Sequence, residues 1–408
     1  MLRQFTGIQP NIVAPSLVSL VVMMGSSMVT PSLPLYAQGI GADEFLVGAV
    51  IAGFAIGRLV FDVPAGFLAD RLGMGRTMIL GLGILVGAST LAGLAPSYWV
   101  LLSARVLEGV GSSIYVSAAI AYVLLSSDAA KRGASIGSYQ SILMTGPIVG
   151  PVAGAPVAEF FGYNAPYFAF AAMALAALAI IAVLNYRGQF KVQHAAGQEG
   201  GRHVNLAVYL NTAAIATFGF TFLRAGTYTT GMPLFAYGGL ELSVFDVGLI
   251  LTMAALANLA SSFFSGRLTQ MFGMQRPLFA AILSSAALVA IIPLAGSMLL
   301  LLVIMTLIGV TSGFFGQSIA WAAEQIEEKV KRKAASAGPA FGVQSHVTRG
   351  IGINRMVGDL GLVIGPLFVG YLIAAFTGNW LVSFGATAAV LAAVSFFILG
   401  TKVECNIR

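Results

Sequence analysis

Long apolar runs follow one another along the chain, and each is about as long as a membrane-spanning helix. One of them, Ala169 to Leu184, contains no charged residue. Hydrophobic residues make up 58% of the 408-residue sequence and charged residues only 9%, too few to cover a water-soluble globule. A bilayer core about 30 Å thick needs roughly 20 apolar residues per helix, so this length has room for about twelve spans. We therefore expect an all-α membrane protein.

The predicted spans form two sets of six. The first set covers residues 11–37, 45–69, 78–95, 98–127, 133–160 and 166–186. The second covers 206–237, 243–265, 277–296, 298–324, 349–375 and 380–401. The first run is too long for a signal peptide and is interpreted as the first helix.

One turn sequence occurs twice, 200 residues apart. Gly66 to Arg76 reads GFLADRLGMGR, and Gly266 to Arg276 reads GRLTQMFGMQR. The match continues upstream, where Val47-Gly48 corresponds to Val247-Gly248. Repetition in register indicates an internal repeat. It predicts two pseudo-symmetric six-helix bundles, residues 1–186 and 206–408, joined by a cytoplasmic linker, residues 187–205.

Basic residues gather in every second connection between the predicted spans, and the remaining connections have no Lys or Arg. By the positive-inside rule, the basic connections and both termini are cytoplasmic. We expect a multi-pass protein of a bacterial-type inner (plasma) membrane. The net charge of +6 is then a topology signal and does not indicate nucleic acid. The basic residues of the cytoplasmic connections are Arg71, Arg76, Lys131, Arg132, Arg187, Lys191, Arg202, Arg267, Arg276, Lys329, Lys331, Arg332 and Lys333.

The sequence lacks the clusters that catalysis or metal binding would need. It has a single cysteine, Cys405, and three histidines without zinc spacing. We expect no metal, no cofactor and no enzymatic activity, and a monomer embedded in lipid. The segment 325–348 contains the charged run Glu327 to Lys333, which predicts either a short amphipathic surface helix or a solvated loop.

The residues Gly66, Leu68, Asp70, Arg71, Gly73 and Arg76 resemble the signature loop between helices 2 and 3 of the major facilitator superfamily, including its drug:proton antiporters. Span count, half-repeat and loop position agree with that family over essentially the whole chain. The resemblance implies that this loop acts as a conformational latch. In the latch, Asp70 would pair with the positive N-terminal end of helix 11 and with Arg349. Its counterpart in the second half is Gln270, so the charged latch would be one-sided.

Two further motifs narrow the resemblance. Arg105-Val106-Leu107-Glu108-Gly109 in helix 4 is similar to the family's Arg-x-x-Gln-Gly, with Glu108 in place of glutamine. In helix 5, residues 146–154 look like the motif that marks efflux members. Its residues here are Gly146, Pro147, Gly150, Pro151 and Gly154.

The helix-5 motif also has a physical reading. Glycines at every fourth position leave a smooth stripe that another helix can approach closely, and prolines bend the helix. Helix 11 repeats part of the pattern at Gly361, Gly365-Pro366 and Gly370. We expect helices 5 and 11 to face each other across the two halves.

Ionisable residues inside predicted spans are costly and mark candidate sites. Four arginines and three carboxylates fall in helix interiors: Arg58, Arg105, Arg224 and Arg355 with Asp62, Glu108 and Asp359. Three opposite-charge pairs lie three or four residues apart on one helical face, so each is either a self-neutralised pair or a functional group. Arg224 has no acid within one turn, which leaves pairing across the cavity or contact with an anionic substrate.

The resemblance places Arg105 near the transport cavity with an influence on proton transfer, so Glu108 becomes its titrating partner. Burial favours the protonated carboxylate and the arginine favours the charged one, and alternating access could shift that balance. Asp359, near mid-helix, and Asp62 are the other proton-carrying candidates. Arg58, Arg105, Arg224, Arg355 and Tyr139 are the cavity candidates.

The sequence therefore predicts a secondary transporter that exchanges protons for a small amphipathic compound by alternating access. One alternative is an uptake symporter or exchanger for an organic anion that uses Arg105 and Arg224. Another is a transporter-like assembly or receptor protein. The excess of arginines weakens the case for a cationic drug and leaves an anionic or zwitterionic solute open.

Overall fold

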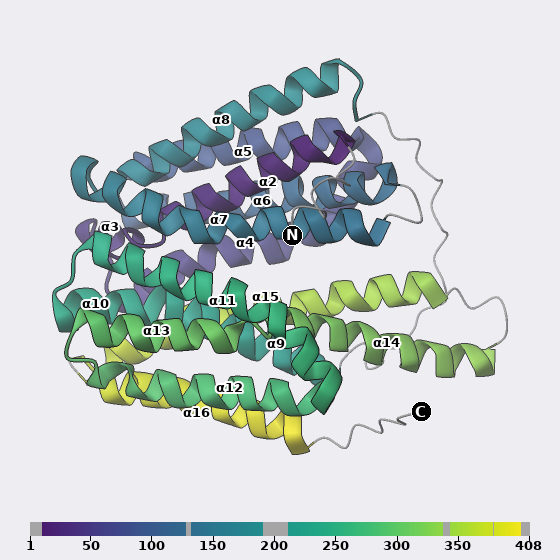
Figure 1. The fold of residues 1–408 in the computed structure, drawn as a ribbon. Helices are drawn as coiled ribbons and strands as arrows, with labels where there is room; N and C mark the ends of the chain where they lie inside the picture. Colours follow the sequence, from purple (N-terminus) through teal and green to yellow (C-terminus); the bar gives the residue numbers. More distant parts are fainter. Residues whose placement is uncertain (1–9, 128–131, 191–210, 338–342, 378, 401–408) are drawn as a thin grey trace. The chain divides into compact units, whose positions relative to one another are not determined.

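The computed structural model describes residues 10–127, 132–190, 211–337, 343–377 and 379–400, and every regular element among them is helical (Figure 1). The helices of the first half are α2 Pro10–Met28, α3 Leu33–Gly39, α4 Glu44–Leu72, α5 Met74–Gly93, α6 Tyr98–Ser126, α7 Arg132–Phe161 and α8 Ala165–Tyr186. Those of the second half are α9 Thr212–Phe222, the π-helix η2 Leu223–Gly231, α10 Met232–Leu240, α11 Val244–Phe272, α12 Gln275–Ile291, the 3₁₀ turn η3 Ile292–Leu294, α13 Met298–Ser312, α14 Phe315–Ala337, α15 Val343–Ala375 and α16 Trp380–Gly400. The expected all-α membrane fold class is confirmed.

Ten described helices are long and apolar enough to cross a membrane, and α2 with α3, bent by 50°, makes an eleventh. The remaining predicted span, residues 206–237, corresponds to α9, η2 and α10. These follow one another without a gap from Thr212 to Leu240, but each is short because a polar π-helical segment separates the two α-helical parts.

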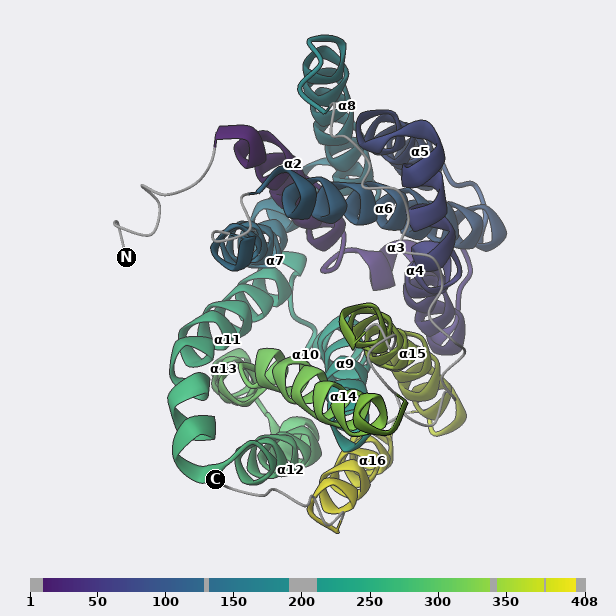
Figure 2. The same ribbon diagram turned by 90° about the vertical axis from the view of Figure 1, so that its right-hand side faces the viewer.

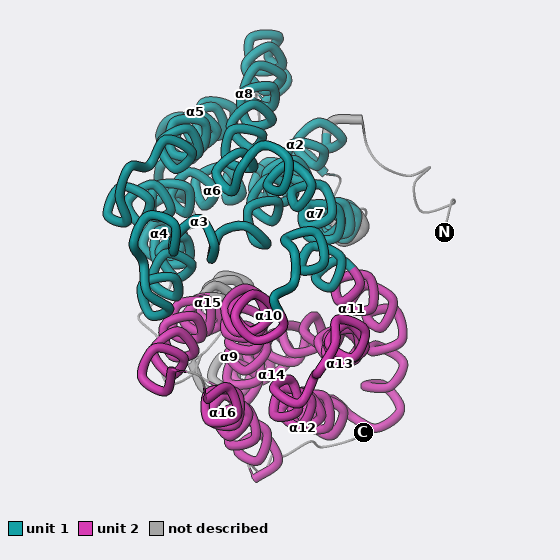
Figure 3. Tube along the Cα trace, turned by 90° about the vertical axis from the view of Figure 1, so that its left-hand side faces the viewer, with its two compact units in different colours: residues 1–195, 241–252 teal, residues 196–240, 253–408 magenta. Residues whose placement is uncertain are grey.

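The chain divides into two compact units (Figure 3). Unit 1 contains residues 1–195 and 241–252, and unit 2 contains residues 196–240 and 253–408. The first turns of α11 belong to unit 1 because they pack on α7. There the Thr252 hydroxyl donates to the carbonyl of Ile148 at 3.3 Å. Most of the predicted linker, residues 187–205, lies outside the described residues.

Glycine allows α4 and α6 to cross at backbone contact in unit 1. A Cβ atom added at Gly109 would collide with the carbonyl of Phe54, and one added at Gly57 would collide with the carbonyl of Val106. The second half repeats this contact, because a Cβ at Gly309 would collide with the carbonyl of Ala254. The contacting positions, 109 with 54 and 309 with 254, are related by the same offset of 200 residues, so the internal repeat of the sequence is also a repeat of packing.

The glycine stripe of α7 packs on α2 of the same unit. Added Cβ atoms at Gly146, Gly150 and Gly154 would collide with α2 between Met23 and Met28. In unit 2, the glycines of α15 pack in the same way on α9 and η2, where a Cβ at Gly361 would meet Thr221. The expectation that helices 5 and 11 face each other across the two halves stays a prediction. Small residues here bring each helix against the first helix of its own unit.

The repeated turn owes its middle glycine to backbone geometry. Gly73 ends α4 with φ of 83°, and Gly273 has φ of 77°, both in the left-handed region that favours glycine. A Cβ at Gly66 would meet no described atom within 4 Å, so nothing described explains that glycine.

The charged run Glu327 to Lys333 belongs to α14, which continues unbroken to Ala337. Salt bridges from Lys331 to Glu327 and from Arg332 to Glu328, each 2.6 Å long, support its exposed face one turn apart. The buried Ile326 and Val330 lie on the opposite face. In Figure 1, α14 extends beyond the ends of α12 and α16. The segment is therefore an extension of the helix and neither a separate surface helix nor, up to Ala337, a loop.

Candidate functional site

A buried ion pair in α6 is the clearest charged site in unit 1. Glu108 is fully buried and Arg105 is 5% exposed, and Arg105 Nη1 donates to Glu108 Oε2 at 2.5 Å. The other carboxylate oxygen, Oε1, accepts from the hydroxyl of Ser89 on α5 at 2.7 Å. Both oxygens of Glu108 are thus engaged by groups from two helices, which satisfies the requirement that buried charges be paired and hydrogen-bonded.

Aromatic side chains from two other helices interact with this pair. The Phe54 ring on α4 has Arg105 Cζ 5.0 Å from its centroid, a cation–π contact. Tyr167 on α8 is fully buried, interacts electrostatically with both Arg105 and Glu108, and has no hydrogen-bond partner for its hydroxyl among the described residues. Its ring lies 5.9 Å from that of Tyr36 on α3. The pair is therefore buried beside aromatic side chains, where charge interactions are strong.

The contacts between α4 and α6 continue one turn at a time along both helices. Phe54 meets Arg105, a Cβ at Gly109 would meet the backbone of Arg58, and Asp62 Oδ1 accepts from the Ser113 hydroxyl at 2.5 Å. Arg58 and Asp62 are both half-buried on this line. The predicted pairing between Arg58 and Asp62 stays a prediction. Ser113 is the Asp62 partner that the sequence did not indicate.

This arrangement can hold and release a proton. Protonating Glu108 removes its charge and leaves Arg105 to other partners, whereas deprotonation restores the ion pair. A movement of α5 or α6 that separates Ser89 or Arg105 from Glu108 would favour the neutral carboxyl. In this geometry, the positions of α5 and α6 would determine which protonation state of Glu108 is favoured.

The charged candidates of unit 2 lie on two helices. Asp359 on α15 is 6% exposed, and the neighbouring carbonyl of Gly358 accepts from Thr221 on α9 at 2.6 Å. Arg224 lies in η2 and is exposed. Arg355 falls within α15, but its side chain lies outside the described residues, as does that of Arg349.

Tyr139 lies in the core of unit 1. It is 1% exposed, and its hydroxyl hydrogen-bonds with that of Ser19 at 2.8 Å. Tyr115 joins the same network by donating to the carbonyl of Pro15 at 2.9 Å. Such a position favours packing over cavity lining, and the sequence could not separate the two.

Among the predicted latch residues, Asp70, Arg71 and Arg76 are exposed at the junction of α4 and α5. In the helix-5 motif, Gly146, Gly150 and Gly154 contact α2, as described above. Pro151 is buried, and its carbonyl oxygen would lie 2.9 Å from a Cβ added at Gly248 in the first turns of α11. The motif therefore lies between α2 and the first turns of α11.

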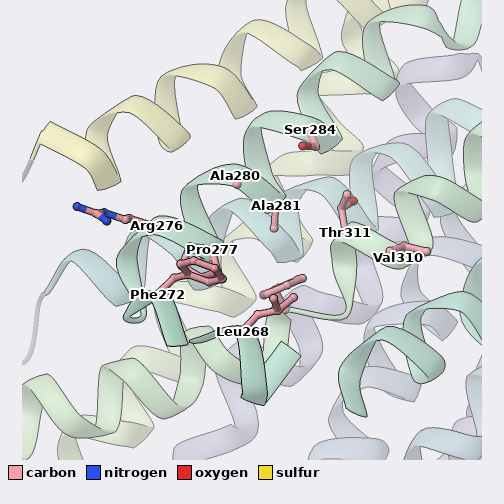
Figure 4. A pocket seen from close by; sticks show the side chains of 10 residues that line it. Leu268, Phe272, Arg276, Pro277, Ala280, Ala281, Ser284, Val310 and Thr311 are labelled. Atoms are coloured by element: carbon pink, nitrogen blue, oxygen red, sulfur yellow. The ribbon is translucent and has the colours of Figure 1, made fainter. Parts of the chain in front are cut away.

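A pocket of about 410 Å³ opens between α11, α12 and α13 in unit 2 (Figure 4). Apolar side chains such as Leu268, Phe272 and Val310 line it, and Figure 4 shows the Arg276 side chain directed away from its centre. None of the predicted cavity or proton-coupling residues lines it. Its composition suits hydrocarbon, and we do not assign the transport chemistry to it.

Comparison with known proteins identifies the family. The family model described as Major Facilitator Superfamily matches residues 16–341. The chain belongs to the major facilitator superfamily. The superfamily consists of transporters and not enzymes.

Relatives and solved structures agree with this assignment. The chain is 26% identical over 377 residues to the multi-drug resistance efflux pump PmrA homolog of Lactococcus lactis, covering 86% of this chain and 84% of the relative. It is 29% identical over 160 residues to the bacillibactin exporter of Bacillus subtilis, a match that spans 38% of this chain and only 40% of the length of that protein. A bacterial homologue of the human lysosomal transporter Spinster matches the fold with a TM-score of 0.75 at 14% identity, over 96% of this chain and 97% of that one.

Sequence reasoning found Arg105 and Glu108 but missed Ser89, Phe54, Tyr167 and Tyr36. Each of these is a single residue in an apolar stretch of another helix, without a charge or motif to mark it. Only the fold of this superfamily member brings them to α6. The sequence gives one weak indication, which is the hydroxyl of Ser89 in an otherwise apolar span.

Removing the Ser89 hydroxyl should destabilise unit 1. In Ser89→Ala one oxygen of a buried carboxylate loses its donor, which costs about 1–3 kcal/mol. We expect a lower melting temperature for the purified protein in detergent. Ser103→Ala is the control, because that exposed hydroxyl donates to the carbonyl of Trp99 in its own helix. Equal melting temperatures for the two variants would contradict the role of Ser89.

Proposed function

We propose that the protein is a proton-coupled antiporter that exports a small amphipathic compound by alternating access of two six-helix bundles. The observation that carries the proposal is the fully buried Glu108, held by Arg105 and Ser89. An ionisable residue inside the membrane costs free energy, so its presence there indicates a function. The Lactococcus lactis relative, which is named an efflux pump, supports the direction of transport.

In the proposed cycle, Glu108 exchanges a proton for its ion pair with Arg105 as the bundles rock. Asp359 and Asp62 are the remaining candidates for a second proton. The orientation follows from the basic connections, with both termini in the cytoplasm of a cell with a bacterial-type inner membrane. The bundles are residues 1–186 and 206–408, with residues 187–205 as the cytoplasmic linker.

Transport in proteoliposomes with an imposed pH gradient tests this proposal. The probes are amphipathic fluorescent compounds that include ethidium as a cation and 1-naphthoate as an anion. We expect flux of at least one probe to rise with the gradient and to collapse when an ionophore dissipates it. Flux that ignores the gradient for every transported probe would refute antiport.

A second function, uptake or exchange of an organic anion, is favoured by the exposed Arg224 in η2. In that case Arg105 and Arg224 would both serve the anionic solute. The same liposomes distinguish the two, because a symporter accumulates the anion on the side toward which protons flow, and an antiporter on the opposite side. An assembly or receptor protein would show no flux in either direction.

The latch role of Asp70 predicts a conformational effect. If Asp70 holds the cytoplasmic side closed through helix 11, then Asp70→Asn should shift the populations of inward-open and outward-open states. Spin labels on the two bundles and pulsed distance measurements report those populations. Glu328→Gln, which changes another exposed carboxylate on α14, serves as the control. Identical distance distributions in Asp70→Asn and wild type would remove the latch role.

A further inference from the structure

Two helices of unit 2 leave regular α-helical geometry. Between α9 and α10, the nine residues of η2, Leu223–Gly231, form a π-helix. Between α13 and α14, the chain turns at Gly313 and Phe314 before the helix resumes. Irregular backbone at membrane depth is tolerated where it is buried in protein or lines an aqueous space, and π segments occur frequently at functional sites.

The two irregular segments meet. The hydroxyl of Tyr228, in η2, lies 3.2 Å from that of Ser312, the last residue of α13. Figure 2 shows α9, α10, α13 and α14 gathered within this unit. A Cβ at Gly313 would lie 2.9 Å from the carbonyl oxygen of Asn258, so close packing on α11 explains a glycine at the break. Discontinuous helices that converge in this way form the binding sites of many secondary transporters.

A charge occupies this junction. Arg224 follows Thr212 by twelve residues in the helical run 212–240, which places it about 18 Å along that run, near the middle of a bilayer core about 30 Å thick. An exposed guanidinium at that depth faces water inside the protein rather than lipid. Arg224 also interacts electrostatically with Tyr228.

A further polar group lies in the same π-helical segment. Thr227 is only 1% exposed. Its hydroxyl has no hydrogen-bond partner among the described residues. Buried hydroxyls are normally satisfied, so an unsatisfied one adjoining Tyr228 indicates hydrogen-bonding capacity that the protein itself does not use.

We propose that the junction of η2 with the α13–α14 break is a subsite for the anionic group of the transported compound. Arg224 supplies the positive charge, and Tyr228, oriented by Ser312, supplies an aromatic face and a hydroxyl. A guanidinium binds carboxylate and phosphate oxygens through two parallel hydrogen bonds, which suits an organic acid. The inference rests on the proposed transport function and narrows its substrate class to amphipathic anions.

The charge balance of such a cycle has a consequence. Exporting one anion and admitting one proton moves two elementary charges in the same electrical sense. A cell-interior negative potential then drives export in addition to the pH gradient. Transport of a neutral analogue would move one charge per proton.

Binding to the purified protein in detergent tests the subsite without a gradient. The probes are 1-naphthoate, its neutral methyl ester and 1-naphthyl phosphate, measured by isothermal titration calorimetry. We expect the wild type to bind an anionic probe at least tenfold more tightly than the ester. Naphthoate and naphthyl phosphate separate a carboxylate subsite from one that accepts any oxyanion.

Matched variants assign the preference to residues. Arg224→Gln should abolish the anion preference and leave binding of the ester unchanged. Arg224→Lys should retain part of the anion preference. Tyr228→Phe should reduce affinity for all probes. Arg276→Gln, which removes an arginine elsewhere in unit 2, should retain the full preference. Size-exclusion profiles and melting temperatures establish that each variant is folded.

The proposal is overturned if the wild type shows no anion preference, absence of binding included, or if Arg224→Gln retains it. Two results distinguish failure of the subsite proposal from failure of the antiport proposal. Anion binding that depends on Arg224 without gradient-driven flux would leave the subsite standing and refute antiport. Gradient-driven flux that is unaffected by Arg224→Gln would refute the subsite and leave antiport standing.

Discussion

Glu108→Gln should abolish stimulation of transport by a pH gradient while substrate exchange without a gradient continues. Glutamine has nearly the same shape and keeps a hydrogen-bonding partner for Ser89 and Arg105, but its amide does not gain or lose a proton at physiological pH. Without a titrating carrier the gradient cannot drive the cycle, so we expect flux under the gradient to fall to the level measured without one. Reconstituted wild type and variant are compared at equal protein content.

Two further variants make this result specific. Asp359→Asn, which removes the other deeply buried carboxylate, should leave coupling largely intact if Glu108 is the carrier. The double variant Arg105→Gln with Glu108→Gln removes both charges, so it avoids the instability of a single buried charge. If both Glu108→Gln and Asp359→Asn remain coupled, the assignment of proton carriers fails.

Gly109→Ala should be the most destabilising small substitution in unit 1. The added methyl group would collide with the backbone carbonyl of Phe54, which a side-chain rotation cannot relieve. Overpacking of this kind costs roughly 1–3 kcal/mol or more, and the shift of α4 against α6 would also displace Arg105 from Phe54. We expect a lower melting temperature and a smaller monodisperse fraction in detergent.

Gly83→Ala is the matched control. Gly83 lies within α5, is exposed, and an added Cβ would meet no described atom within 4 Å. Alanine favours a helix more than glycine does, so this substitution should be neutral or slightly stabilising, by up to about 1 kcal/mol. Loss of stability in Gly83→Ala equal to that in Gly109→Ala would show that backbone contact between α4 and α6 is not the cause.

Local patterns predicted much of the fold. Apolar run lengths located the spans, because a helix must satisfy its own backbone groups across the bilayer. The repeated turn was recognised from Gly73 and Gly273, whose positive φ angles only glycine adopts readily. Superfamily membership followed from the same motif. Arg105 and Glu108 were visible as charges in an apolar helix.

Other features depend on contacts between distant segments. The sequence shows the polar stretch Leu223–Gly231, but its π-helical form accompanies close packing on α15, where a Cβ at Gly226 would lie 3.2 Å from the carbonyl of Gly365. The packing of the α7 stripe on α2 was not predicted, because periodicity identifies a face and not its partner. Ser89 and Tyr167 reach Glu108 only through the fold.

Proton release on substrate binding tests the central claim most directly. Purified protein in a weakly buffered detergent solution, with a pH indicator dye, is mixed with whichever probe shows gradient-dependent flux. The account predicts that wild type and Asp359→Asn release a proton per bound molecule near neutral pH, and that Glu108→Gln releases none. Equal release by Glu108→Gln and wild type would contradict it.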